Sequence, residues 1–206
     1  MTGLYTVDHN SLDIAPSDVP GVVKIPISVS AEGNCLSRCG SIFAFGHDNW
    51  HREIRARIVM ELVINEGLYI ENEYLRRGTD IKCNVKENFA QYSEIFTPGI
   101  ILTDHIIASI FEEETRQCVK LGTYMGIWQL FALANILKCP IMSVYPQFVQ
   151  GHLRLYLHRI MLSEKNERVK ESNMAHIMWT STRKDMRPIN WILNHYTALL
   201  PIDRCF

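Results

Sequence analysis

Hydrophobic positions repeat with a helical period over most of the chain and with a strand period near its end. Apolar residues three and four positions apart predict helices over 35–45, 48–67 and 125–139, with further helical segments between 68 and 121. Asp48 is expected to cap the second helix and Gly67 to end it. Thr-Pro-Gly at 97–99 marks a turn between the polar segments.

After Pro140 the period changes to that of strands. The stretch IMSVYP predicts a short buried strand, and HLRLYLHRIML alternates leucines with polar residues as a half-buried strand does. The charged SEKNERVKESN that follows is expected to be an exposed loop, and MAHIMWTSTR and HYTALLP after it predict two more strands. Helices followed by a sheet predict one α+β domain over 30–206. Residues 1–29, which contain three prolines, are expected to form an extended N-terminal arm.

Composition narrows the classes of function. The chain has 206 residues, 47% of them hydrophobic and 21% charged, as globular proteins do. The net charge of -1 gives no indication of nucleic acid or an anionic membrane as partner. No secretory signal is visible, and the most apolar window is interrupted by polar residues and Pro140. Six scattered cysteines indicate free thiols in a reducing, intracellular compartment, cytoplasmic or nuclear. We expect a monomer without a cofactor.

Candidate chemistry begins at Cys35, which follows Gly33-Asn34 and opens a predicted helix. The N–H groups and dipole at a helix start favour thiolate, the nucleophilic form of cysteine. A nucleophilic cysteine needs a base, and His195 opens the last predicted strand. Each residue alone is more often structural. A cysteine and a histidine far apart in sequence can meet in the fold.

Three motifs resemble those of the OTU (ovarian tumour) deubiquitinases, in the same order. EGNCLSR resembles the cysteine motif, MGIWQLFALANILKCPIMSVYP the middle signature of a turn, a helix and a strand, and NHYTALLP the histidine motif. The second half is also similar to the OTU-related segment of vertnin-type proteins. The resemblance implies an OTU-type, papain-like cysteine protease fold with a central, mostly antiparallel sheet flanked by helices. It implies hydrolysis of the (iso)peptide bond after the C-terminal glycine of ubiquitin or polyubiquitin.

Site residues follow from the resemblance, position by position. Cys35 would be the nucleophile and His195 its base. Glu32, Gly33 and Asn34 would form the oxyanion loop, and Gly126 and Tyr196 would border the substrate channel. Glu32 stands where the family has aspartate.

The third catalytic residue stays open. The family often places Asn or Asp two residues after its histidine, where this chain has Thr197. Strand geometry puts Thr197 on the same face as His195. A threonine hydroxyl can accept the imidazole N–H but cannot neutralise an imidazolium. The resemblance also allows an acid from the N-terminal arm, Asp13 or Asp18.

Other patterns have simpler interpretations. Cys35 and Cys39, like His47 and His51, are four residues apart as zinc ligands on a helix can be, but their spacing does not fit a common zinc finger, and we expect no metal. Trp128 is expected in the core, and His176 half-buried beside a neighbour. The run FEEETR is interpreted as an exposed helix face, with contact to ubiquitin as the less favoured alternative.

Two other functions fit the same motifs. Thr197 favours a catalytically silent OTU-like module that binds ubiquitin or another protein. The third hypothesis is a cysteine protease acting on a ubiquitin-like modifier. Reaction of Cys35 with a ubiquitin-derived electrophile distinguishes them.

Overall fold

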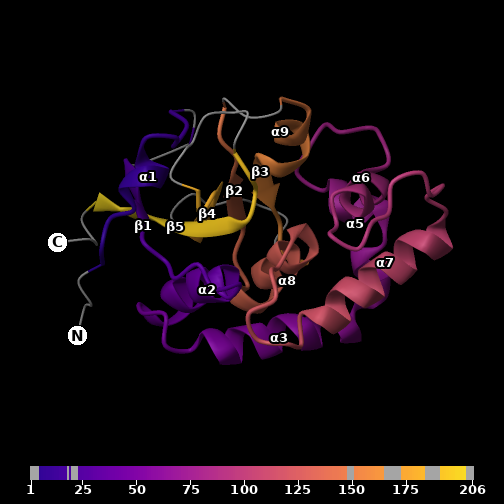
Figure 1. Cartoon of the computed structure of the whole chain (residues 1–206), viewed down its shortest axis with the longest axis horizontal. Helices are drawn as coiled ribbons and strands as arrows, with labels where there is room; N and C mark the ends of the chain where they lie inside the picture. Colours follow the sequence, from indigo (N-terminus) through magenta and orange to yellow (C-terminus); the bar gives the residue numbers. More distant parts are fainter. Residues whose placement is uncertain are drawn as a thin grey trace.

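The computed structural model describes residues 5–17, 19, 23–147, 151–164, 173–183 and 191–202. Within these ranges, five strands form one sheet in the order β1-β5-β4-β2-β3 (Figure 1). The strands are β1 (Lys24–Ile27), β2 (Ile141–Val144), β3 (Arg159–Met161), β4 (Ala175–Thr180) and β5 (His195–Pro201). Only β2 and β4 pair in parallel among them. The predicted α+β class with a mostly antiparallel sheet is confirmed.

Helices surround this sheet in the described part of the chain. They are α1 (His9–Leu12), α2 (Cys35–Phe45), α3 (His51–Ile64), α4 (Glu66–Tyr69), α5 (Asn72–Arg76), α6 (Val85–Gln91), α7 (Asp104–Gln117), α8 (Ile127–Leu137) and α9 (Gly151–Leu157). Figure 1 shows α2 and α8 against one face of the sheet, with α3 packed across both. None of these helices is both long and apolar enough to cross a membrane.

The two faces of the sheet bury different sets of residues. Along β5, Tyr196, Ala198 and Leu200 point into the large core that α2 and α8 cover. Leu199 points the other way and packs with Ile14 in a smaller cluster. Because side chains alternate along a strand, His195 and Thr197 leave β5 on the same side as Leu199. The first residue of β5 therefore points towards the face that carries α1.

The N-terminal segment is more ordered than an extended arm. Asp8 caps the short helix α1, and Lys24 to Ile27 form the edge strand β1, which pairs antiparallel with β5. The expectation of an arm without a packed helix is therefore wrong within residues 5–17 and 23–27. Pro26 does not prevent the strand, because an edge strand tolerates a residue without an N–H.

Several helix boundaries match the sequence and others do not. The helix over 35–45 is confirmed as α2, ended by Gly46 in a left-handed conformation with φ 74°. Asp48 does not cap α3, whose N-cap is Trp50, and Gly67 lies within α4.

The leucine-rich segment 152–162 was expected to be one strand and instead contains most of helix α9, followed by β3. Leu153 and Leu157, four residues apart, are buried, whereas Leu155 is 57% exposed. The burial pattern is therefore that of a helix. Most of the expected loop, residues 165–172, lies outside the described residues.

Candidate active site

Cys35 is the first residue of α2, and a tight loop delivers it there. Gly33 has φ +78°, a conformation that only glycine adopts readily. A Cβ on Gly33 would lie 1.8 Å from the carbonyl oxygen of Gly122. Glycine is thus required both for the backbone turn and for the close approach of the two loops.

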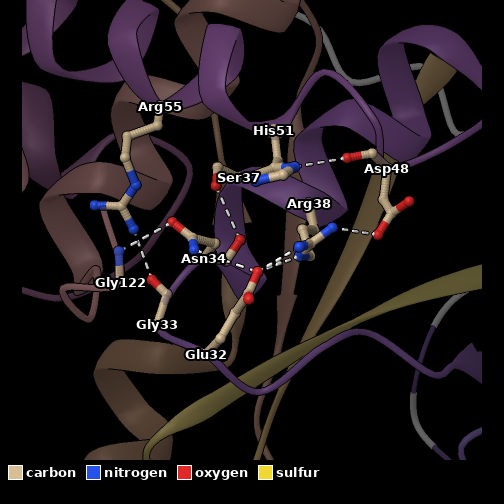
Figure 2. A network of polar contacts seen from close by, with 9 residues as sticks. All are labelled: Glu32, Gly33, Asn34, Ser37, Arg38, Asp48, His51, Arg55 and Gly122. Atoms are coloured by element: carbon tan, nitrogen blue, oxygen red, sulfur yellow. Dashed lines mark hydrogen bonds and ion pairs between the residues drawn. The ribbon is translucent and has the colours of Figure 1, made fainter. Parts of the chain in front are cut away.

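Arg55, from α3, fastens these two loops together (Figure 2). Its side chain is 2% exposed, and its Nη2 donates to the carbonyl of Gly33 at 2.6 Å and to that of Thr123 at 2.8 Å. Nη1 donates to the carbonyls of Cys118 at 2.9 Å and Lys120 at 3.2 Å. Four carbonyl acceptors compensate a buried cation, so the backbone before Cys35 is held by the segment 118–123.

Asn34 and Glu32 extend this network towards the surface (Figure 2). The side chain of Asn34 accepts from the N–H of Gly122 at 3.2 Å and donates to Glu32 at 3.3 Å. Glu32 also pairs with Arg38, which reaches Asp48 at 2.6 Å. The hydrogen bonds from Arg38 and Asn34 lower the pKa of Glu32. The longer acid at this position therefore anchors its own loop through Arg38.

The Cys35 thiol is buried, with 1% of the residue exposed. Burial raises its pKa to about 11, while the N–H groups of Tyr196, Leu36 and Cys35 itself act in the opposite direction. The thiol is therefore protonated at neutral pH. The N–H of Tyr196 also shows that the sulfur lies next to the peptide that joins His195 to Tyr196. The fold thus brings the cysteine and histidine motifs together.

The imidazole of His195 interacts with the Val29 backbone, but one of its ring nitrogens is unpaired within the described residues. Its Nδ1 is buried and accepts or donates no hydrogen bond there. Burial lowers the pKa of His195, and the Asp8 carboxylate and the Val29 backbone act in the opposite direction. No hydrogen bond joins the ring to the thiol of Cys35 in this part of the chain.

Each expected orienting residue can now be located. Thr197 is buried and donates its hydroxyl hydrogen to the carbonyl of Ile27 at 2.5 Å. This hydrogen bond joins β5 to β1. Asp13 ends α1, and Asp18 lies outside the described residues. The acid that acts on His195 is Asp8, whose carboxylate accepts from the N–H and hydroxyl of Ser11.

Tyr196 and Gly126, the expected channel residues, are in contact. The ring of Tyr196 stacks on Tyr124 with centroids 5.8 Å apart, and its hydroxyl donates to the carbonyl of Gly126 at 3.3 Å. Gly126 and Tyr124 line a cavity of about 80 Å³ together with Glu114. The cavity is small, and its lining is apolar apart from two carboxylates, of Glu114 and Glu94, and a few hydroxyls.

Glu114 shows that the run FEEETR is not simply an exposed face. Its carboxyl group is buried and accepts from the Ser93 hydroxyl at 2.5 Å, and its Oε1 has no partner. Burial raises the pKa of Glu114 to about 7. Glu113 of the same run is exposed at the surface and pairs with Arg116.

The cysteines and histidines considered as zinc ligands, Cys35, Cys39, His47 and His51, do not form a cluster that could hold a metal ion. Across the described ranges, no group of three or more His, Cys, Asp or Glu side chains is arranged to hold a metal ion. Cys39 is in the core, and the ring of His51 lies 3.0 Å from the carbonyl oxygen of Asp48. Trp128 is fully buried, as expected, and His176 is buried rather than half-buried.

Sequence reasoning missed Arg55 and Glu114, although both follow the apolar period of their helices. Arg55 is three residues before Ile58 on the buried face of α3, and Glu114 is three after Phe111 on that of α7. A charged residue in a buried stripe is a signal that could have identified both.

The family model of the vertnin OTU domain, described as "Vertnin, OTU domain", matches residues 26–180. The chain belongs to this family. The match includes the Cys35 loop, the middle signature and β4, and it ends before His195. The predicted OTU-type fold and the likeness to vertnin are thereby confirmed.

Individual relatives agree with this assignment. The chain is 28% identical to Vertnin of Mus musculus over 176 residues, which is 84% of this chain and 22% of that protein. It is 26% identical to Vertnin of Danio rerio over 179 residues, 86% of this chain and 25% of that protein. The chain therefore spans about a quarter of the length of these relatives.

Solved OTU domains resemble the structure at low sequence identity. The OTU domain of OTUD1 superposes with a TM-score of 0.45 and 17% identity, covering 86% of this chain and 85% of that one. The viral OTU domain protease from Farallon virus has a TM-score of 0.47 and 14% identity, covering 86% and 84%.

Proposed function

We propose that this domain is an OTU-type thiol hydrolase that cleaves the (iso)peptide bond after the C-terminal glycine of ubiquitin or polyubiquitin. One observation carries the proposal: the sulfur of Cys35 lies at the start of α2, beside the peptide that joins His195 to Tyr196. A loop held by Arg55 positions that sulfur. Packing alone does not require a cysteine at such a position.

The chemistry assigned to these residues is acyl transfer. His195 takes the proton of the Cys35 thiol, and the sulfur attacks the glycine carbonyl carbon. Backbone N–H groups of residues 32–35 stabilise the negative oxygen that forms; one such donor is typically worth about 10²–10³ in rate. His195 then gives its proton to the leaving lysine amine. A water molecule hydrolyses the thioester and frees both the glycine carboxylate and the thiol.

Burial of the Cys35 thiol means that this mechanism starts from a protonated sulfur. The thiol is neutral in the resting domain, because its pKa is raised to about 11. The thiolate therefore has to form after substrate binding, when His195 and the sulfur come within hydrogen-bond distance. A domain of this kind is inactive until the tail of its substrate enters the site.

A second candidate function is a silent OTU module that binds ubiquitin or another protein without cleaving it. The unpartnered Nδ1 of His195 favours this alternative, because an unoriented imidazole is a poor base. The hydroxyl of Thr197 donates to the carbonyl of Ile27, and its oxygen accepts no hydrogen bond from Nδ1 of His195, which is the contact that an orienting threonine would make.

A ubiquitin probe with a C-terminal electrophile separates the two functions. Intact mass is measured after incubation with wild type and with the Cys35→Ala, His195→Ala and Cys83→Ala variants. Cys83 is an exposed free thiol and therefore the matched control for non-specific labelling. Hydrolysis predicts one adduct that disappears with Cys35→Ala, weakens with His195→Ala and persists with Cys83→Ala.

The opposite result is equally informative. If folded wild type forms no adduct, the hydrolase proposal fails and the binding module is the better account. Ubiquitin binding is then measured by calorimetry with the Cys35→Ala variant. An adduct that depends on Cys83 would be labelling without catalysis and would count against the hydrolase.

A further inference from the structure

Arg159, at the opposite end of the sheet from β1, is a buried cation without an anion. The residue is 5% exposed, and no ion pair is formed with it in the described part of the chain. Its Nη2 donates to the carbonyl of Arg77 at 2.9 Å, and its guanidinium lies 5.3 Å from the centre of the Phe131 ring. The buried Nε and Nη1 have no hydrogen-bond partner.

The charge of Arg159 is not compensated by a buried anion within the described residues. Burial lowers the pKa of Arg159 only to about 10, so the side chain stays charged at neutral pH. An uncompensated buried charge is strongly unfavourable, and arginine is suited to paired hydrogen bonds with carboxylate or phosphate. The buried Arg55, by contrast, donates to four carbonyls. Arg159 thus retains the donors that an oxyanion would use.

Arg159 also lines a cleft of about 640 Å³. The cleft lies between β3, the last strand of the sheet, and the segment 78–83. Lys82 and His158 are further basic residues of its lining, and Asp80 is an acid there. A single oxyanion fits this balance better than a polyanion does, because Asp80 and the net charge of -1 oppose a long run of negative charge.

The rest of the lining indicates what would carry the oxyanion. Ile81, Leu155 and Ile160 are apolar, and Leu155 is 57% exposed. Free phosphate would leave these side chains unused. A peptide would place apolar neighbours on them and would lie along β3, which within the described ranges pairs with β2 alone.

We propose that this cleft binds a short peptide through one oxyanion, a phosphate or a carboxylate, with Arg159 as its principal ligand. Lys82 contributes at the entrance, and the apolar lining binds the residues next to the oxyanion. The site is remote from Cys35 in sequence and its occupancy does not depend on the proposed hydrolase activity.

Calorimetry on the 206-residue chain tests this site. The probes are inorganic phosphate, acetate, and three five-residue peptides that carry leucines around a central phosphoserine, glutamate or serine. We expect saturable binding of the peptides with an oxyanion, about tenfold or more tighter than of the free ions, and none of the serine peptide. The phosphoserine and glutamate peptides together identify which oxyanion is preferred.

Three variants locate the binding. Arg159→Gln should weaken peptide binding about tenfold or more, because it removes the charge-assisted bonds. Lys82→Glu, at an exposed position where folding is not at risk, should weaken it at least severalfold. Arg57→Gln, an exposed arginine of α3, is the control and should leave binding unchanged.

Contrary results are equally defined. The proposal fails if wild type binds neither charged peptide, if it binds free phosphate or acetate as tightly as the charged peptides, or if Arg159→Gln binds like wild type. Should Arg159→Gln not fold, Lys82→Glu decides alone: undiminished binding to that variant overturns the proposal.

Discussion

The loop that carries Cys35 is fastened to its neighbours by a buried arginine, whereas the strand that carries His195 leaves Nδ1 of the imidazole unpaired within the described residues. On the cysteine side, Arg55 donates to four carbonyls, two glycines touch, and Asn34 bridges the loops. On the histidine side, Thr197 donates to the sheet and Nδ1 is unpartnered.

The difference indicates where movement is possible. Cys35 is held in place by its loop, and its thiol is protonated at neutral pH because burial raises its pKa. The histidine, at the first residue of its strand, has no hydrogen bond at Nδ1 that would resist rotation. Any activation is therefore expected on the histidine side, and variants on the two sides should differ in kind: loss of stability on one and altered chemistry on the other.

Arg55→Met should have the largest effect. It leaves four carbonyls without their donor and releases the loop before Cys35, and we expect the free energy of unfolding to fall by about 3–5 kcal/mol. Urea denaturation measures the loss. Arg57→Met, on the exposed side of the same helix, is the control and should change stability little. An equal loss from both variants would show that Arg55 does not hold the loop.

Gly33→Ala should have the second largest effect. We expect the free energy of unfolding to fall by about 2–4 kcal/mol, because alanine is strained in the left-handed backbone and its Cβ would clash with Gly122. Gly99→Ala is a matched control, because Gly99 has φ +92° and nothing within 4 Å of its Cβ position. Its loss should be about 1 kcal/mol. The difference between the two variants measures the contact between the loops; no difference would mean that the loops separate freely.

Thr197→Val removes a hydrogen bond of the strand that carries His195. It leaves the Ile27 carbonyl without a partner, and we expect a loss of about 1–2 kcal/mol. Thr115→Val is the control, since the buried hydroxyl of Thr115 has no hydrogen-bond partner. Reaction with the ubiquitin probe should be unaffected in Thr197→Val. A rate that falls far more than stability would make Thr197 the orienting residue after all.

The smallest expected effect is on the pH dependence of stability. His195 should destabilise the domain as pH falls, and Cys35 should destabilise it as pH rises. Burial lowers the pKa of His195 below 6.5, so unfolding becomes easier as pH falls below that value. Burial raises the pKa of Cys35 from 9.0 to about 11, so stability is lost as pH rises above 9. Each slope is at most about 1.4 kcal/mol per pH unit for one proton.

Difference measurements isolate these groups from others that titrate. Burial raises the pKa of Glu114 to about 7, so its contribution makes the domain less stable as pH rises from 4.5. This pH dependence is opposite to that of His195 in the acid range. Subtracting the pH profile of His195→Gln from that of wild type removes Glu114 from the comparison. Cys35→Ala does the same on the alkaline side. A flat difference profile for either variant contradicts the shift assigned to it.

The sequence predicted those parts of the fold in which one local rule dominates. α2 has the expected bounds because apolar periodicity and the terminal Gly46 agree. The prediction of a strand over 152–162 was wrong because leucines at every second position also satisfy a four-residue spacing, and burial decided between the two. Strand β1 was missed because Pro26 indicated a break, which an edge strand does not require.

The site was predicted at the level of its motifs and not of its polar network. The Cys35 and His195 motifs were found, and the fold brings their backbones together. Arg55 could not be assigned to the Cys35 loop, because its acceptors are carbonyls of residues 33 and 118–123, and backbone carbonyls have no signature in sequence. The influence of Asp8 on His195 likewise depends on the docking of α1.

The pairing of β1 with β5 has a consequence for synthesis. Lys24 to Ile27 pair along their length with Ala198 to Pro201, so this edge of the sheet stays unfinished until β5 has left the ribosome. Contacts between such distant segments form late, because a long chain must be closed before they are gained. The nascent polypeptide therefore carries its cysteine in an unassembled site until the residues of β5 have been synthesised.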